Sequence, residues 1–163
     1  MRSRPQSSPA RGRRRSPEKT QLLFSDRIHS TTDAIEPIVH QVIKEINHWG
    51  CSDGHCESIE LALREALANA IIHGNRSNAR KLVAVDCFLQ GEENILLVIR
   101  DQGHGFDPSR VSNPTAPENV YRAGGRGIFL IRHFMDEVEF GRGGREIRMH
   151  KNLSLPARHR SGS

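Results

Sequence analysis

The chain has 163 residues, which is enough for one domain with a hydrophobic core. Its net charge of +5 is unevenly placed: residues 1–19 hold seven Lys or Arg and one Glu, whereas the other 144 residues hold 17 basic and 18 acidic side chains. The bulk of the chain is near neutral, so its composition gives no reason to expect direct nucleic-acid binding.

Residues 1–19 contain almost no apolar side chains and no hydrophobic stretch of the kind found in secretory signals. We therefore expect a disordered basic tail here, a folded domain over 20–152 and a flexible tail over 153–163. No stretch is apolar enough to span a membrane, so the sequence predicts a cytoplasmic protein.

Three cysteines make an odd number, and without a signal peptide they predict structural thiols and no disulfide framework. Cys51, His55 and Cys56 lie close together, which invites comparison with a zinc site. No second Cys/His pair with ligand spacing follows them, so we expect no metal there.

In chain order, residues 21–27 are predicted to form a short strand. Ser30, Thr31 and Thr32 are N-cap candidates for a helix that runs to about Trp49 and ends at Gly50. The apolar stripe of this helix consists of Ile35, Ile38, Val39, Val42, Ile43 and Ile46.

The next segment, ELALREALANAIIHGN at 60–75, is predicted to be helical throughout because it is rich in strong helix formers and has no proline. Glu65, Asn69 and His73 recur at intervals of four and so share one helix face. A carboxylate, an amide and an imidazole in one row suit a metal–phosphate site. The same pattern fits a surface helix with polar residues facing water, and the helix alone leaves both readings open.

Two hairpins are predicted in the second half of the chain, one from strands 81–89 and 95–101 and one from strands 136–140 and 145–151. A third helix over 124–135 lies between them. This order predicts an α+β fold, a two-layer sandwich in which about three helices cover one face of a mainly antiparallel sheet.

Two glycine-bearing segments, DQGHG at 101–105 and GGRG at 124–127, stand at element ends. Glycines there let the backbone approach a ligand closely, and the first N–H groups of a helix can bind phosphate. Either segment alone is typical of an ordinary turn. Neither matches a P-loop or a dinucleotide-binding fingerprint.

Taken together, ExxxN with HGN, then DxGxGF, then GGRGIFLI resembles the GHKL ATPases. Within them the chain resembles the bacterial anti-sigma-factor serine-protein kinases, over about residues 21–151. The resemblance implies the Bergerat-type ATP-binding fold, with ATP and Mg²⁺ as cofactors and a short lid in the irregular segment 108–123.

The same resemblance implies residue roles. Glu65 matches the general base that takes the proton of an attacking hydroxyl, and Asn69 matches the oxygen ligand of Mg²⁺. Asp101 matches the carboxylate that recognises the adenine amino group. The other nucleotide-binding candidates are His73, Gly103, Gly105, Arg122, Gly125, Arg126 and Gly127.

Several of these residues also have ordinary structural interpretations. Glu65 fits an exposed helix glutamate, His73 fits a packed histidine that closes the helix, and Arg122 and Arg126 fit solvated arginines. One departure from the family concerns Arg145. The family often has Thr after the glycines that lead into the last strand, where it supports adenine binding, but here Gly144 is followed by Arg145.

The resemblance implies an ATP-dependent protein serine/threonine kinase that also acts as an anti-sigma factor. Its expected partners are a sigma factor and a STAS-domain anti-anti-sigma protein, which it phosphorylates, and a homodimer stays open. The alternative is a nucleotide-binding regulatory module that switches partners without significant kinase activity.

Overall fold

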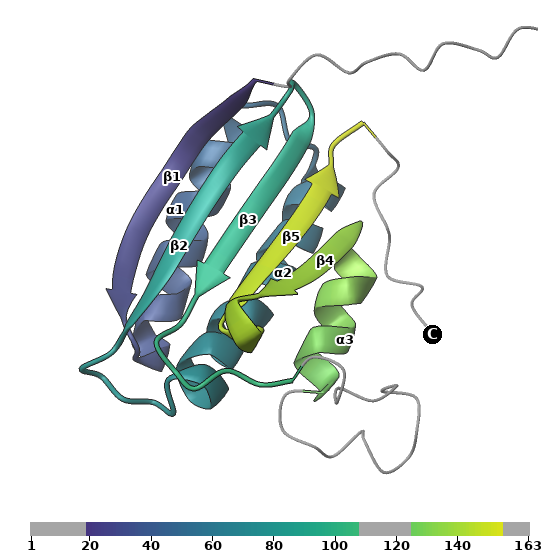
Figure 1. Ribbon diagram of the computed structural model, residues 1–163. Helices are drawn as coiled ribbons and strands as arrows, with labels where there is room; N and C mark the ends of the chain where they lie inside the picture. The colour runs from purple at the N-terminus through teal and green to yellow at the C-terminus, as the bar shows by residue number, and fades with distance from the viewer. Residues whose placement is uncertain (1–18, 108–124, 155–163) are drawn as a thin grey trace, which may run out of the picture.

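The computed structural model describes residues 19–107 and 125–154, which form a sheet covered on one face by helices (Figure 1). The strands are β1 (Thr20–His29), β2 (Leu82–Gln90), β3 (Asn94–Arg100), β4 (Glu137–Gly141) and β5 (Glu146–Asn152). The helices are α1 (Ile35–Asn47), α2 (Asp53–Ala68) and α3 (Gly125–Phe134), with a π-helical turn at Asn69–Gly74 and 3₁₀ turns at Thr32–Ala34 and Arg142–Gly144.

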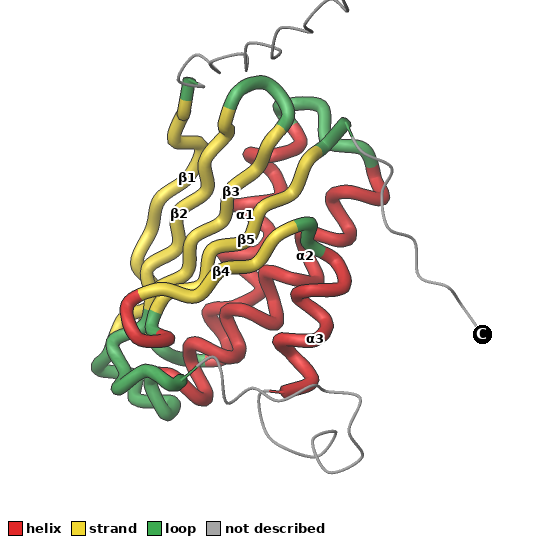
Figure 2. The backbone as a smooth tube through the Cα atoms, turned by 45° about the vertical axis from the view of Figure 1, so that its right-hand side comes forward, coloured by secondary structure: helices red, strands yellow, loops and turns green. Residues whose placement is uncertain are grey.

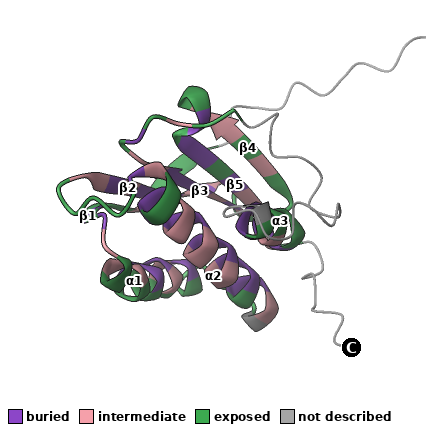
Figure 3. Cartoon of the chain, turned by 90° about the horizontal axis from the view of Figure 1, so that it is seen from below, coloured by how far each residue is buried: buried purple, intermediate pink, exposed green. Residues whose placement is uncertain are grey.

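The five described strands follow the order β1-β2-β3-β5-β4, and every neighbouring pair is antiparallel. Figures 2 and 3 show all three helices on one side of this sheet. The predicted α+β sandwich is therefore confirmed. In this strand order, β2 and β3 pair as one hairpin and β4 and β5 pair as the other. Strand β5 lies beside β3, which leaves β4 at the edge of the sheet.

The core lies between the sheet and the helix layer. Alternate residues of β2 are buried against the helices, and α1 contributes the apolar stripe seen in its sequence. The fully enclosed side chains include Val83, Val85, Cys87, Leu97, Ile99, Val42, Ile46, Leu63 and Leu67. Burial also raises the pKa of the Cys87 thiol to about 12, which makes this cysteine a packed, unreactive one.

The opposite face of the sheet carries a charge network. Arg100 bridges Asp86 on β2 and Glu146 on β5, with distances of 2.5 Å from Nη1 and Nε to the carboxylate oxygens. Arg148 Nε lies 2.8 Å from the other oxygen of Glu146. Glu146 is only 3% exposed, so these cations compensate a carboxylate that has lost most of its water.

Helix α3 is fastened to the sheet at its C-terminal end. The buried ammonium of Lys151, on β5, donates a 2.8 Å hydrogen bond to the carbonyl oxygen of Phe134 and lies 3.5 Å from Asp136 Oδ1. A cation at a helix C-terminus also interacts favourably with the helix dipole. This contact holds the helix whose first turn enters the candidate site.

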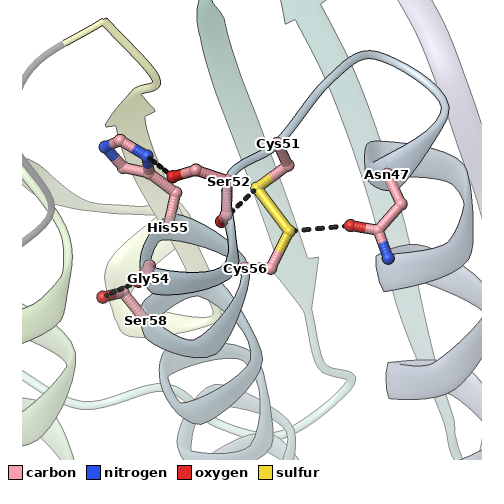
Figure 4. Close-up of a disulfide and its surroundings, with 7 residues drawn as sticks. All are labelled: Asn47, Cys51, Ser52, Gly54, His55, Cys56 and Ser58. Carbon is pink, nitrogen blue, oxygen red and sulfur yellow. Dashed lines mark hydrogen bonds between the residues drawn. A yellow bond between two sulfur atoms is a disulfide. The ribbon is translucent and has the colours of Figure 1, made fainter.

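The turn between α1 and α2 corrects one expectation. Cys51 and Cys56 are joined as a disulfide, with Cα atoms 6.0 Å apart (Figure 4), so the expectation that both are free thiols is wrong. Ser52 is the N-cap residue of α2, and its carbonyl accepts from the N–H groups of His55 and Cys56. That first turn folds Cys56 back toward Cys51, within the range that a disulfide spans.

Within residues 19–107 and 125–154, no group of three or more His, Cys, Asp or Glu side chains is placed so that it could hold a metal ion. In the same two ranges, no helix combines the length and apolar character needed to cross a bilayer. The predicted tails at 1–19 and 153–163 fall almost wholly outside the described part of the chain.

Candidate functional site

Helices α2 and α3 meet at the two polar residues that the sequence singled out. A Cβ atom at Gly127, in the first turn of α3, would lie 2.9 Å from Glu65 Oε2 and 3.0 Å from Asn69 Nδ2. Both polar side chains are partly buried. The structure therefore places a carboxylate and an amide against a helix N-terminus, where N–H groups lack intrahelical partners.

The end of this helix differs from the prediction. The α-helix ends at Ala68, and Asn69–Gly74 form a π-helical turn in which the N–H of Asn75 donates to the carbonyl of Ala70, at 2.8 Å. Glu65 and Asn69 are partly buried, whereas His73, which lies within the π-helical turn, faces solvent. His73 is exposed, and so the alternative of a packed histidine is wrong.

Asp101 follows β3, and hydrogen bonds hold both its backbone and its carboxyl group. Its own N–H donates to the carbonyl of Arg145, at 3.0 Å, and its Oδ1 accepts the N–H of Gly103, at 2.7 Å. Burial raises the pKa of Asp101, while the Gly103 N–H and the charges of Arg145 and Lys81 act in the lowering direction.

Two glycines let the π-helical turn and the loop after β3 approach each other. A Cβ atom at Gly74 would lie 2.5 Å from Cγ of Asp101, and one at Gly103 would collide with the carbonyl of Gly74. The π-helical turn and the loop after β3 are therefore in direct backbone contact at Gly74 and Gly103. Only residues without a side chain fit both positions.

The loop after β3 also packs on the turn that links β4 and β5. The N–H of Phe106 donates to the carbonyl of Gly143, at 3.1 Å, and Gly105 has a φ of +78° with its Cα against the same carbonyl. Arg145, in this turn, is exposed, and its Nε donates to the carbonyl of Arg142, at 3.0 Å. A cation near Asp101 therefore stands at position 145, where the resemblance implies a Thr.

Of the remaining candidates, Arg126 is exposed in the first turn of α3, and Gly125 is the first residue of that helix. Arg122 and the predicted lid at 108–123 lie outside the described residues. The structure therefore gathers two groups of site residues, one at the α2–α3 contact and one around Asp101. The π-helical turn connects them.

Sequence reasoning missed two residues of this site as individual contributors. Gly74 is required by its contact with Asp101, and Asn75 is 1% exposed and bonds two other segments with its side chain. The HGN motif contains both residues. Nothing in the spacing distinguishes them from an ordinary helix end, because their contacts are with residues more than 20 positions later or across a loop.

Comparison with known proteins gives the family. Residues 28–151 match the histidine kinase-like ATPase domain. The serine-protein kinase RsbW of Staphylococcus epidermidis is 30% identical, over 74% of this chain and 80% of the relative. The anti-sigma F factor of Bacillus cereus is 39% identical over 50% of this chain and 56% of its own length.

A solved structure, the histidine kinase domain from Erythrobacter litoralis EL346 blue-light activated histidine kinase, aligns with a TM-score of 0.49 and 20% identity, over 76% of this chain and 61% of that chain. The family match covers all three helices, β2, β3, β4, β5 apart from its last residue, and only the end of β1. The chain belongs to the histidine kinase-like ATPase domain family, in the group of the anti-sigma-factor serine-protein kinases.

Proposed function

We propose that this protein is an ATP-dependent protein serine/threonine kinase and anti-sigma factor that works by partner switching in the cytoplasm. Its protein substrate is a STAS-type anti-anti-sigma protein, and its other partner is a sigma factor. The observation that carries the proposal is the meeting of Glu65 and Asn69 with the first turn of α3. The relatives named above support the same activity. The functional unit in this proposal is residues 20–152, with residues 1–19 and 153–163 as tails outside it.

The residues present fit Mg·ATP. Asp101, oriented by the Gly103 N–H, offers a carboxylate to an exocyclic amine, and the glycines at 74 and 103 let the two backbone segments pack closely around that carboxylate. The side-chain oxygen of Asn69 is the kind of ligand that Mg²⁺ prefers, and α3 aims free N–H groups at phosphate. Bound Mg²⁺ would neutralise negative charge on the phosphate oxygens.

Glu65 is assigned as the general base. It takes the proton from a Ser or Thr hydroxyl as that oxygen bonds to the γ-phosphorus and the bond to the ADP oxygen breaks. Its carboxylate lies beside the N-terminus of α3, which binds the phosphates in this proposal. The contact between α2 and α3 at Gly127 therefore places the base next to the phosphoryl group. His73, Gly105, Gly125 and Arg126 belong to the nucleotide-binding surface in this proposal, together with Arg122.

A second candidate function is a nucleotide-responsive partner switch without significant phosphotransfer. Arg145 favours it, because a cation stands where the family often has the Thr that supports adenine binding. This candidate keeps the same fold and partners and differs only in the chemistry at Glu65.

Labelled ATP and a purified STAS-domain partner separate the two candidates. The wild type should transfer label to Ser or Thr, and Glu65→Gln should reduce transfer by roughly 10²–10⁴-fold while ATP binding stays nearly intact. Glu57→Gln, an exposed position on the same helix, is the matched control and should behave as wild type. Absence of transfer by the wild type, with ATP bound, would favour the partner switch.

A further inference from the structure

Asn75 is a buried amide that joins three separate segments of the chain. It is 1% exposed and directly follows the π-helical turn. Its Nδ2 donates to the carbonyl of Leu82, at the start of β2, over 3.0 Å. Its Oδ1 accepts the N–H of Gln102, in the loop after β3, over 2.8 Å. A side chain in this position can hold the three segments in register.

A third bond closes the arrangement. Gln102 Oε1 accepts the N–H of Leu82, at 2.8 Å, so both backbone polar groups of Leu82 are bonded to side chains rather than to a neighbouring strand. Asn75, Leu82 and Gln102 therefore form a closed set of three hydrogen bonds. Asn75 is the buried member of this set, and its removal takes the hydrogen-bond partner from both the Leu82 carbonyl and the Gln102 N–H.

The bond from Gln102 bears directly on Asp101. The N–H of Gln102 belongs to the peptide plane that begins at the Cα of Asp101. Asn75 fixes this plane on one side, and the bond from the Asp101 N–H to the carbonyl of Arg145 fixes the other. The backbone of Asp101 is clamped from both sides. Its carboxylate then stands against Gly74, which immediately precedes Asn75.

We propose that Asn75 is a positioning residue that acts through Asp101 and sets the preference of the site for a purine with a 6-amino group. The proposal rests on the assignment of Asp101 to base recognition in the proposed function. Asn75 is too deeply enclosed to touch a ligand itself, and its contacts run to the backbone that carries the carboxylate. A purely structural amide would support the fold without affecting the choice of base.

The test is a double-mutant cycle on nucleotide affinity. Full-length protein is titrated with ATP and with ITP, which has an oxygen in place of the 6-amino group, for wild type, Asn75→Ala, Asp101→Asn and the double variant. Asn75→Ala should weaken ATP binding by roughly ten-fold and leave ITP binding within about two-fold. In the Asp101→Asn background, Asn75→Ala should cause no further loss.

Two further variants serve as a control and as a substitute for Asn75→Ala. Asn78→Ala removes an exposed amide of the same loop, whose Oδ1 accepts only the local N–H of Arg80 among the described bonds, and should keep the wild-type ratio of ATP to ITP affinity. Asn75→Asp keeps the size and the acceptor for Gln102 but loses the donor to Leu82. It takes the place of Asn75→Ala in the cycle if the alanine variant does not fold.

The outcomes separate this inference from the function on which it rests. Equal loss of ATP and ITP affinity in Asn75→Ala, or additive losses in the double variant, would give Asn75 a structural role only. A wild type that binds ATP and ITP equally would instead remove Asp101 from base recognition, and the proposal for Asn75 would fall with it. An ATP preference that Asp101→Asn abolishes and Asn75→Ala leaves intact would overturn the Asn75 proposal alone.

Discussion

Asp101 and Gly74 are in contact across the junction of the π-helical turn and the loop after β3, with no space for a side chain between them. A methyl group at Gly74 would lie 2.5 Å from Cγ and 2.6 Å from Oδ2 of Asp101. The backbone of Gly74 does not have a positive φ, so alanine is compatible with its conformation. The effect of a substitution there comes from the collision alone.

Gly74→Ala should therefore displace the carboxylate of Asp101 and lower ATP affinity by roughly ten-fold or more, because placement errors of about 1 Å have effects of that size. ITP affinity should change less. Isothermal titration with both nucleotides measures the difference. Unchanged ATP binding by a folded Gly74→Ala protein would show that the carboxylate position does not matter for the base.

Gly127→Ala tests the other half of the site. The added Cβ would lie 2.9–3.2 Å from the ends of the Glu65 and Asn69 side chains, which can yield by a few tenths of an ångström. Phosphotransfer should fall by about 10-fold to 10²-fold, while the ratio of ATP to ITP affinity should stay at the wild-type value. The two glycine variants thus predict opposite patterns. The same pattern in both would mean that the two groups of residues do not act separately.

The sequence predicted the layered fold because its apolar residues recur at the regular spacings of strands and helices. Val83, Val85 and Cys87 alternate in a strand, and the apolar stripe of α1 repeats at helical spacing. The contact of Glu65 with Gly127 could not be derived this way, since it joins residues about 60 positions apart. Only the resemblance to a family linked them. The family resemblance also named Asp101, whose pocket is made by glycines from two distant segments.

The missed features have a physical reason in common. A π-helical turn has no distinctive residue pattern, so the sequence of Asn69–Gly74 looks like a continuation of the α-helix. The Cys51–Cys56 disulfide depends on how the first turn of α2 folds back, which cysteine counting does not register. Asn75 reads as a helix-ending residue, and its bonds to β2 and to the loop after β3 exist only once the sheet has formed.

Glu146→Gln should destabilise the fold. Burial by itself raises the pKa of this carboxyl group, but the hydrogen bonds from Arg100 and Arg148 outweigh it, and the pKa lies below its ordinary value of 4.5. Removing the charge weakens the hydrogen bonds that the part-buried Arg100 and the exposed Arg148 donate to this buried group, at a cost of roughly 1–3 kcal/mol in the free energy of unfolding. Chemical denaturation at neutral pH measures this.

The pH dependence gives a second test of Glu146. Because the pKa is depressed in the folded state, the stabilisation is present above pH 4.5 and is lost as the pH falls through the lower folded-state value. The difference in unfolding free energy between wild type and Glu146→Gln should therefore shrink in acid. Glu139→Gln, an exposed position on β4, is the matched control. If both substitutions changed the unfolding free energy equally, the ion-pair network around Glu146 would contribute no more to stability than an exposed glutamate.

Asp101→Asn should make the protein more stable and a poorer binder of ATP. Burial raises the pKa of Asp101, so the ionised carboxylate is disfavoured in the folded state relative to the unfolded chain. The sign follows by linkage: the penalty is absent below the ordinary value of 3.8, grows as the pH rises through the higher folded-state pKa, and is complete at neutral pH. Asparagine keeps the oxygen that accepts the Gly103 N–H and carries no charge. At pH 7 the variant should melt at a higher temperature than wild type, with ATP affinity reduced.

Near pH 3.5 the melting temperatures of wild type and Asp101→Asn should converge. If Asp101→Asn melts at a lower temperature than wild type at neutral pH, the carboxylate stabilises the loop after β3 instead.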